Sequence, residues 1–182
     1  MFTLFKAAAP RVSRFAAAKQ GVAAVEFSLI LVPFMLLIVG VAEIAMIGFA
    51  QSSLDFAVNE TARDIRTGEA QMSNKNQSEI ENVLCSEMGN FLGIDCAGAL
   101  YLDVQRFDSF VDAAAVQNPI VDNAFQTGAF GYQPGAPSDI VVVRAFYRWQ
   151  TLTPMFRDVF KNVANGDRIL ASSMMFRNEP YQ

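Results

Sequence analysis

The sequence has no histidine, only two cysteines, and charges on just 18% of its 182 residues. Without histidine the chain lacks the most common general base and zinc ligand, and hydrolases built on Ser-His-Asp or Cys-His groups are excluded. Two cysteines cannot complete a four-thiolate metal site. The net charge of −4 argues against a nucleic-acid binder, which needs a basic surface. Apolar residues, at 52%, are abundant enough for one domain with a buried core.

The charges are divided by a long apolar segment. Residues 1–20 have a charge of +4, which leaves −8 on the remaining 162 residues. The cations of this leader are Lys6, Arg11, Arg14 and Lys19. The segment 22–50 then has only Glu26 and Glu43 as charges, with sixteen uncharged residues between them. As a helix, residues 22–42 would extend about 31 Å, the thickness of the hydrocarbon layer. The positive-inside rule predicts one span with a cytoplasmic N-terminus.

A cleaved secretory signal peptide is the alternative interpretation of this segment. The small residues Gly48 and Ala50 precede Gln51, as at an A-x-A-like cleavage site. The apolar region of a signal peptide is normally about 7 to 15 residues long. Because this one is longer and is bracketed by carboxylates, a membrane-spanning helix is the favoured prediction.

A processing motif, GVAAVEF, lies at residues 21–27, where the leader meets the apolar segment. Cutting after Gly21 would free the amine of Val22 one helical turn from Glu26, or facing that carboxylate on an adjacent subunit. The alternative is a glutamate placed by chance in a first helical turn, where the helix dipole favours it. Since the apolar run follows directly, the motif predicts prepilin-type processing, which removes a leader and keeps the hydrophobic segment.

Helical spacing continues beyond the membrane segment. The apolar residues Ile47, Leu54, Val58 and Ile65 recur at seven, four and seven residues. We therefore expect residues 51–68 to form an exported amphipathic continuation that ends near Gly68, giving a helix of about 45 residues.

Residues 69–182 are predicted to form an exported α+β head. The expected elements are a polar linker over 69–77, a short helix from a capping box at 78–81 up to Gly89, a strand from Ala99, a long loop over 112–139, a strand over 140–149, a helix over 154–163 and a strand over 168–177. The expected fold is α+β, with one long N-terminal helix packed on a small antiparallel sheet and short additional helices.

Cys85 and Cys96 would both lie on the exported side, where the compartment is oxidising. They suggest a disulfide between the short helix and the segment before the first strand, contributing about 2 to 3 kcal/mol by restricting the unfolded chain. Two buried, reduced thiols are the alternative. No nearby residue offers the soft ligands that would complete a metal site.

Two further groups of residues are candidates for chemistry. Four aspartates could offer oxygen ligands to a hard cation, but the D-x-D-x-D-G spacing is missing, so we expect solvated surface and no metal or cofactor. These are Asp95, Asp103, Asp108 and Asp112. The apolar face of the helix expected over 154–163 is interpreted as core or subunit interface, with a membrane-proximal role as the alternative. It comprises Met155, Phe156, Val159 and Phe160.

Residues 21–71, GVAAVEFSLILVPFMLLIVGVAEIAMIGFAQSSLDFAVNETARDIRTGEAQ, closely resemble TadE-like pilus assembly proteins, the minor pseudopilins of bacterial tight-adherence (Flp) pilus systems. The resemblance extends over residues 21–181. It continues through Cys85 and Cys96, FGYQPG at 130–135, SDIVVVR at 138–144, NGDR at 165–168 and FRNEPY at 176–181. One departure is YRWQ at 147–150, where relatives tend to have an acid and a proline around the tryptophan, which puts in doubt any shared contact there.

This resemblance implies a pilin-like fold and cleavage between Gly21 and Val22 by a dedicated prepilin peptidase. Glu26 would be the fifth residue of the mature chain, followed by Phe27. The implied partners are a second, TadF-like minor pseudopilin, the major Flp pilin and the inner-membrane assembly platform. The expected location is the bacterial inner membrane, with one span and a periplasmic head, or the pilus itself.

The favoured function is therefore a non-enzymatic subunit that primes or supports pilus assembly. The alternative is a single-pass envelope receptor or adhesin ectodomain, which needs an anchor but no cut at Gly21. An envelope enzyme that uses the aspartates is a third hypothesis, although nothing in the sequence arranges a nucleophile beside a base.

Overall fold

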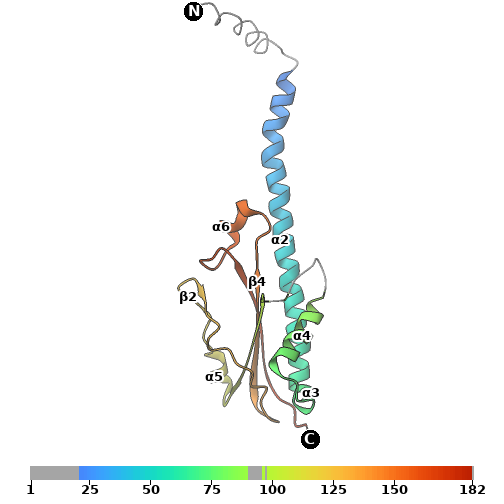
Figure 1. Ribbon diagram of the computed structural model, residues 1–182, viewed down its shortest axis with the longest axis vertical. Coiled ribbons are helices and arrows are strands. Elements are labelled where there is room, and N and C mark those ends of the chain that lie inside the picture. Colours follow the sequence, from blue (N-terminus) through green and yellow to red (C-terminus); the bar gives the residue numbers. More distant parts are fainter. Residues whose placement is uncertain (1–20, 90–95, 97, 182) are drawn as a thin grey trace, which may run out of the picture. The chain divides into compact units, whose positions relative to one another are not determined.

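The computed structural model describes residues 21–89, 96 and 98–181. The chain divides into an N-terminal unit that ends at Ala42 and a C-terminal unit, Glu43–Gln182. Helix α2, Val22–Arg66, runs through both units as 45 residues without interruption (Figure 1). It ends where expected, because Gly68 adopts a φ of +83°, a left-handed conformation that favours glycine.

The sheet of the C-terminal unit has three antiparallel strands in the order β1-β4-β5. The strands are β1, Leu100–Phe107; β4, Ile140–Trp149; and β5, Arg168–Arg177. Every residue of the central strand β4 is buried except Arg148, which is half-buried. A strand covered on both faces is expected to form such a continuous apolar run. All three predicted strands are confirmed.

The C-terminal part of α2 packs on this sheet through the predicted stripe. Leu54, Val58 and Ile65 are completely buried and share one core with Val104 and Val143 of the sheet. Ile47 is partly buried against the same core. Fully burying each of the three stripe residues contributes about 1.5–3 kcal/mol, so the stripe is a main source of stability.

Two short helices follow α2, and here the sequence-based boundaries were wrong. The expected linker contains α3, Glu69–Met72, and the next helix, α4, is Gln77–Met88. The capping box predicted at Ser78 begins instead at Asn76, whose side chain accepts a hydrogen bond from the Glu79 N–H at 3.0 Å. The Glu79 carboxylate accepts one from the Asn76 N–H at 2.7 Å, which completes the box.

The expected long loop over 112–139 has structure of its own. It contains part of α5, Phe110–Ala114, and a two-stranded hairpin of β2, Ile120–Val121, and β3, Ala124–Phe125. Phe125 and Phe130 lie against Phe146 of β4, with ring centroids 5.6 Å and 5.3 Å away. This segment thus covers part of β4 with aromatic side chains.

The helix predicted over 154–163 was also wrong in extent. The 3-10 helix η3, Pro154–Phe156, is followed by the single turn of α6, Arg157–Phe160. The helix stops because Asn162 bonds the start of β5, donating to the Ile169 carbonyl at 2.9 Å and accepting from the Ile169 N–H at 2.7 Å. Val163 is buried, but Met155 and Val159 are 64% and 72% exposed, which excludes the core and leaves the other two predicted places, a subunit interface or a membrane-proximal position.

Candidate functional site

The predicted processing residues lie together at the start of α2. Val22 is the first helical residue, and it is 51% exposed, as Phe27 is at 65%. A Cβ atom added at Gly21 would meet no heavy atom within 4 Å. Glu26 is exposed and, among the described residues, no hydrogen bond or ion pair engages its carboxylate. Because Val22 and Glu26 are four residues apart, they share one helix face. Of the predicted cytoplasmic leader, residues 1–21, residues 1–20 lie outside the described residues.

The N-terminal unit exposes apolar side chains on all sides of the helix. Leu29 and Ile30 are 71% and 69% exposed, and Phe34 and Leu37 are 56% and 63% exposed. α2 is long and apolar enough to cross a membrane, and only 6% of its most apolar stretch is buried within the protein. A helix that is hydrophobic all round needs lipid or other apolar helices around it. This half of α2 is therefore a candidate membrane-spanning segment.

Glu43, the first residue of the C-terminal unit, is a buried carboxylate, 1% exposed. It accepts three hydrogen bonds, from the Leu152 N–H at 3.0 Å, the Thr153 N–H at 3.2 Å and the Thr153 hydroxyl at 3.1 Å. Hydrogen bonds of this kind replace the water that a buried carboxylate loses. We call these three residues the Glu43 clasp. It ties the segment after β4 to the residue that follows the apolar run.

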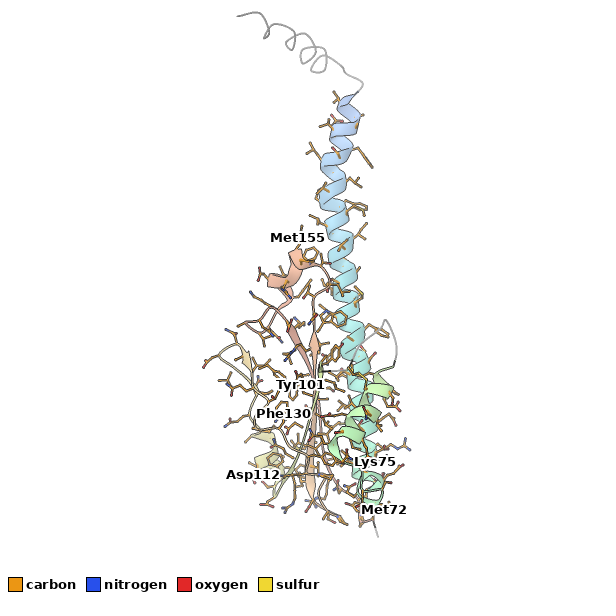
Figure 2. All side chains as sticks on the ribbon, viewed as in Figure 1. Met72, Lys75, Tyr101, Asp112, Phe130 and Met155 are labelled. Atoms are coloured by element: carbon orange, nitrogen blue, oxygen red, sulfur yellow. A yellow bond between two sulfur atoms is a disulfide. The ribbon has the colours of Figure 1, made fainter. Side chains whose placement is uncertain are left out.

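Beside the clasp, three large apolar side chains face solvent. Leu152 is 62% exposed, and Met155 and Val159 follow in η3 and α6 at 64% and 72%. We call these three residues the apical patch. Met155 and Asp112 lie toward opposite ends of the C-terminal unit (Figure 2). The sequence indicated the apolar character of this segment but did not decide between a core, a subunit interface and a membrane-proximal role.

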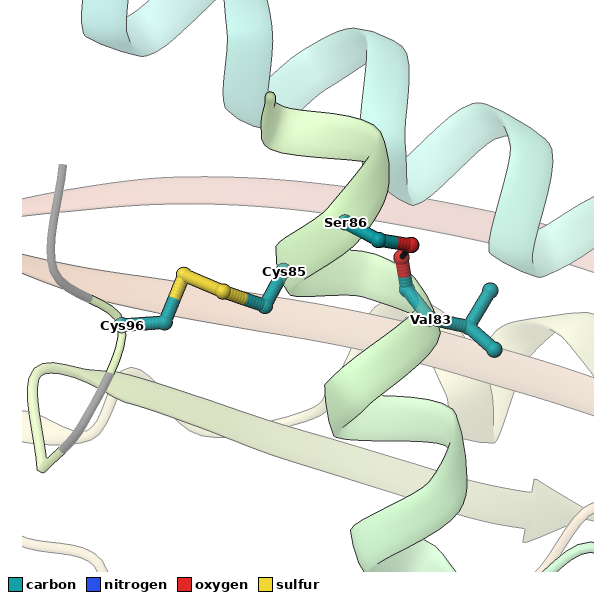
Figure 3. Close-up of a disulfide and its surroundings, with 4 residues drawn as sticks. All are labelled: Val83, Cys85, Ser86 and Cys96. Carbon is teal, nitrogen blue, oxygen red and sulfur yellow. Dashed lines mark hydrogen bonds between the residues drawn. A yellow bond between two sulfur atoms is a disulfide. The ribbon is translucent and has the colours of Figure 1, made fainter. Parts of the chain in front are cut away.

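The predicted disulfide is confirmed: Cys85 of α4 is bonded to Cys96, as Figure 3 shows. The Cys96 carbonyl accepts hydrogen bonds from the N–H groups of Ala99 and Leu100 at 3.1 and 3.2 Å. The disulfide therefore anchors the turn that begins β1 to α4. In the same helix the Ser86 hydroxyl donates to the Val83 carbonyl at 2.7 Å (Figure 3).

One of the four aspartates expected on the solvated surface lies in the core. Asp103 of β1 has no exposed surface and stands opposite Arg144 of β4, whose Nε donates to its Oδ2 at 3.0 Å. Asp103 Oδ1 accepts from the Gly131 N–H and from the Gln105 amide, both at 3.0 Å. The expectation was wrong here because both faces of the sheet are covered. Asp95 lies outside the described residues, whereas Asp108 and Asp112 are exposed.

A pocket of about 470 Å³ lies beside the sheet, lined by Arg144 and by residues of the segment 112–130. The charged residues of its lining are Asp112 and Arg144. Asp112 accepts a hydrogen bond from the Ser109 hydroxyl at 2.6 Å, and Arg144 donates to Asp103 and to the Gln117 carbonyl at 2.7 Å. Since the fold already engages both charges, this pocket is a weak candidate for ligand binding.

Comparison with known families matches residues 21–63 to a family described as TadE-like protein. The matched segment begins at Gly21, includes Glu26 and Glu43, and ends within α2. The resemblance noted in the sequence is thus confirmed over these residues. No curated protein and no solved structure matched the chain.

Proposed function

We propose that this chain, which is TadE-like over residues 21–63, is a minor pseudopilin that supports assembly of a tight-adherence pilus. It acts without catalysis. Its leader is removed after Gly21, its apolar helix packs laterally against other pilin helices, and its exported part selects neighbouring subunits. The family match supports a role in this pilus system; the role of a minor pseudopilin and its partners are our proposal.

The observation that carries this proposal is that the two parts of one continuous helix have different surroundings. The first part of α2 exposes apolar side chains all round, whereas the second part supplies Leu54, Val58 and Ile65 to a folded core. A helix built in this way joins an exported domain to a lipid or helix-packing environment without a flexible linker. A filament subunit whose helix packs beside others needs such a continuous helix.

The same helix argues against a signal peptide that ends at Ala50. Ala50 is completely buried in the core of the C-terminal unit, and Glu43 forms the clasp with Leu152 and Thr153. Cleavage before Gln51 would remove both residues from the folded unit. The segment 22–50 is therefore proposed to remain in the mature protein.

The proposed partners are the prepilin peptidase, a TadF-like second minor pseudopilin, the major Flp pilin and the inner-membrane assembly platform. The carboxylate of Glu26 is proposed to accept a hydrogen bond from the amine of Val22 that the cut frees, in its own chain or in an adjacent subunit. The proposed location is the inner membrane, with a periplasmic C-terminal unit. The anchored receptor or adhesin is the alternative, and it differs from the proposed function in needing no cut at Gly21.

The experiment is to measure the N-terminal residue and the intact mass of membrane-extracted protein, with and without the cognate prepilin peptidase. We expect a start at Val22 only when the peptidase is present, and loss of that start in Gly21→Ala. Since a Cβ atom at Gly21 meets nothing within 4 Å, the variant should fold normally.

Gly48→Ala is the matched control, because Gly48 lies within α2, away from the predicted cut, and its Cβ atom likewise meets nothing within 4 Å. It should be cleaved like the wild type. A start at Met1 in every sample would favour the anchored receptor, and a start at Gln51 would identify a signal peptide. Either result would overturn the proposal.

A further inference from the structure

We propose that the apical patch, Leu152, Met155 and Val159, inserts into the interfacial layer of the bilayer at the outer end of the span. The C-terminal unit would then contact lipid directly while the protein is in the membrane. This inference rests on the membrane insertion that the proposed function includes, but not on leader cleavage or on pilus assembly.

The apical patch is attached to the chain close to the end of the apolar run. Glu43 directly follows the sixteen uncharged residues of the apolar run in the same helix. The Leu152 N–H lies 3.0 Å from a Glu43 carboxylate oxygen. The segment 152–160 is therefore fixed to the residue at which the span ends. Met155 lies toward the end of the C-terminal unit that carries α6 (Figures 1 and 2).

The side chains of the segment 152–160 suit a membrane interface. Its three exposed side chains are large and apolar, and Phe156 and Phe160 of the same segment lie against each other, with ring centroids 5.9 Å apart. Apolar side chains with basic residues beside them are typical of segments that lie in the membrane interface.

The charges of this segment suit the same location. Asp158 is already paired with Lys161 at 2.6 Å, so Arg157, which is exposed, is left to contribute a net positive charge. A positive charge beside an apolar surface suits anionic lipid headgroups. A bilayer interface is therefore the occupant that these residues fit best.

The test uses the full chain with one added cysteine, Met155→Cys, carrying an environment-sensitive fluorophore. Both native cysteines are held in a disulfide, so the added thiol is the one that reacts. The protein is inserted into vesicles of phosphatidylethanolamine and phosphatidylglycerol, with or without lipids that carry a nitroxide quencher near the headgroup. We expect a blue-shifted emission and a loss of fluorescence when the nitroxide lipid is present.

Three further labels act as controls. Val159→Cys repeats the measurement at a second patch position and should behave like Met155→Cys. Val111→Cys, an apolar residue of α5 that is 80% exposed, should stay water-exposed and unquenched. Ile38→Cys reports on the span itself and should be quenched by nitroxides placed deep in the acyl chains.

The outcomes separate the possible failures. Patch labels that stay as water-exposed as the Val111 label, while the Ile38 label is quenched, would overturn this inference alone. Patch labels that are blue-shifted but unquenched, and that lose the shift when the protein is diluted in lipid, would assign the patch to a protein partner and also overturn it. An unquenched Ile38 label would overturn the membrane insertion itself. Quenched patch labels support the inference whatever the result of the cleavage experiment.

Discussion

Replacing Glu43 by glutamine should loosen the segment after β4 without unfolding the protein. The carboxylate accepts three hydrogen bonds, two from backbone N–H groups and one from the Thr153 hydroxyl. A glutamine of the same shape has one acceptor oxygen, and its NH₂ group would meet a backbone N–H as a second donor. At least one hydrogen bond of the Glu43 clasp is then lost.

The size of the effect follows from the charge on the acceptor. A hydrogen bond to a charged group contributes about 1.5–3 kcal/mol, so the free energy of local opening should fall by about 2 kcal/mol. Since 1.4 kcal/mol is about a factor of ten, the amides of Leu152 and Thr153 should exchange roughly 30-fold faster.

The assay is hydrogen–deuterium exchange with mass spectrometry on the full chain in detergent micelles, following peptides that contain residues 152 and 153. Thr153→Val, which removes only the hydroxyl bond, should give an intermediate acceleration. Glu60→Gln is the matched control in the same helix, because the ion pair of Glu60 with Arg63, 3.6 Å long, is between exposed side chains. Unchanged exchange at these amides in Glu43→Gln would refute the clasp.

Three further predictions concern the C-terminal unit. Asp103→Ala should lower the free energy of unfolding, measured by chemical denaturation, by about 3–5 kcal/mol, because it leaves Arg144 buried without its carboxylate partner. The double variant Asp103→Ala with Arg144→Met should recover part of this loss. Gly68→Ala should lower the melting temperature, because the φ of this residue is +83° and its Cβ atom would lie 2.2 Å from the Tyr181 ring. Gly98→Ala is also at positive φ but its Cβ atom would meet nothing within 4 Å, so it should lower the melting temperature less. Burial raises the pKa of Tyr132 above its ordinary 10.0. The contribution of the neutral phenol to the free energy of unfolding is therefore complete below pH 10.0 and is lost as pH rises through the folded-state pKa. In unfolding measured as a function of pH, Tyr132→Phe should make this alkaline loss of stability less steep, and an equally steep loss would contradict the assignment.

The elements that could be predicted from the sequence are those with a local periodic signal. The spacing of Leu54, Val58 and Ile65 needs no partner to be recognised as one helix face, and the same is true of the apolar run of β4. Gly21 and Glu26 could be proposed as processing residues because they lie within one short motif next to a charge boundary. For these features the information lies within a few residues.

The features that could not be predicted depend on contacts between distant residues. Asp103 looks like a surface residue until β4 places Arg144 opposite it, 41 residues later. Glu43 looks like the edge of an apolar run, because its partner Thr153 is 110 residues away. Likewise, no local signal shows that Asn162 bonds Ile169 and thereby ends α6. Polar pairing at long range is set by strand register and loop closure, which a periodic pattern does not contain.

The position of β4 in the chain has a consequence for the order of folding. A chain synthesised from its N-terminus presents the stripe of α2 long before residues 140–149, which must pair with β1 and cover that stripe. Contacts of such large sequence separation form slowly. The apolar face of the helix thus lacks its cover from β4 until residues 140–149 have emerged, and the segment that bonds Glu43, residues 152 and 153, follows directly. A chaperone or a neighbouring subunit that shields residues 54–65 during this interval would act on the nascent protein, before the sheet that finally covers this face exists.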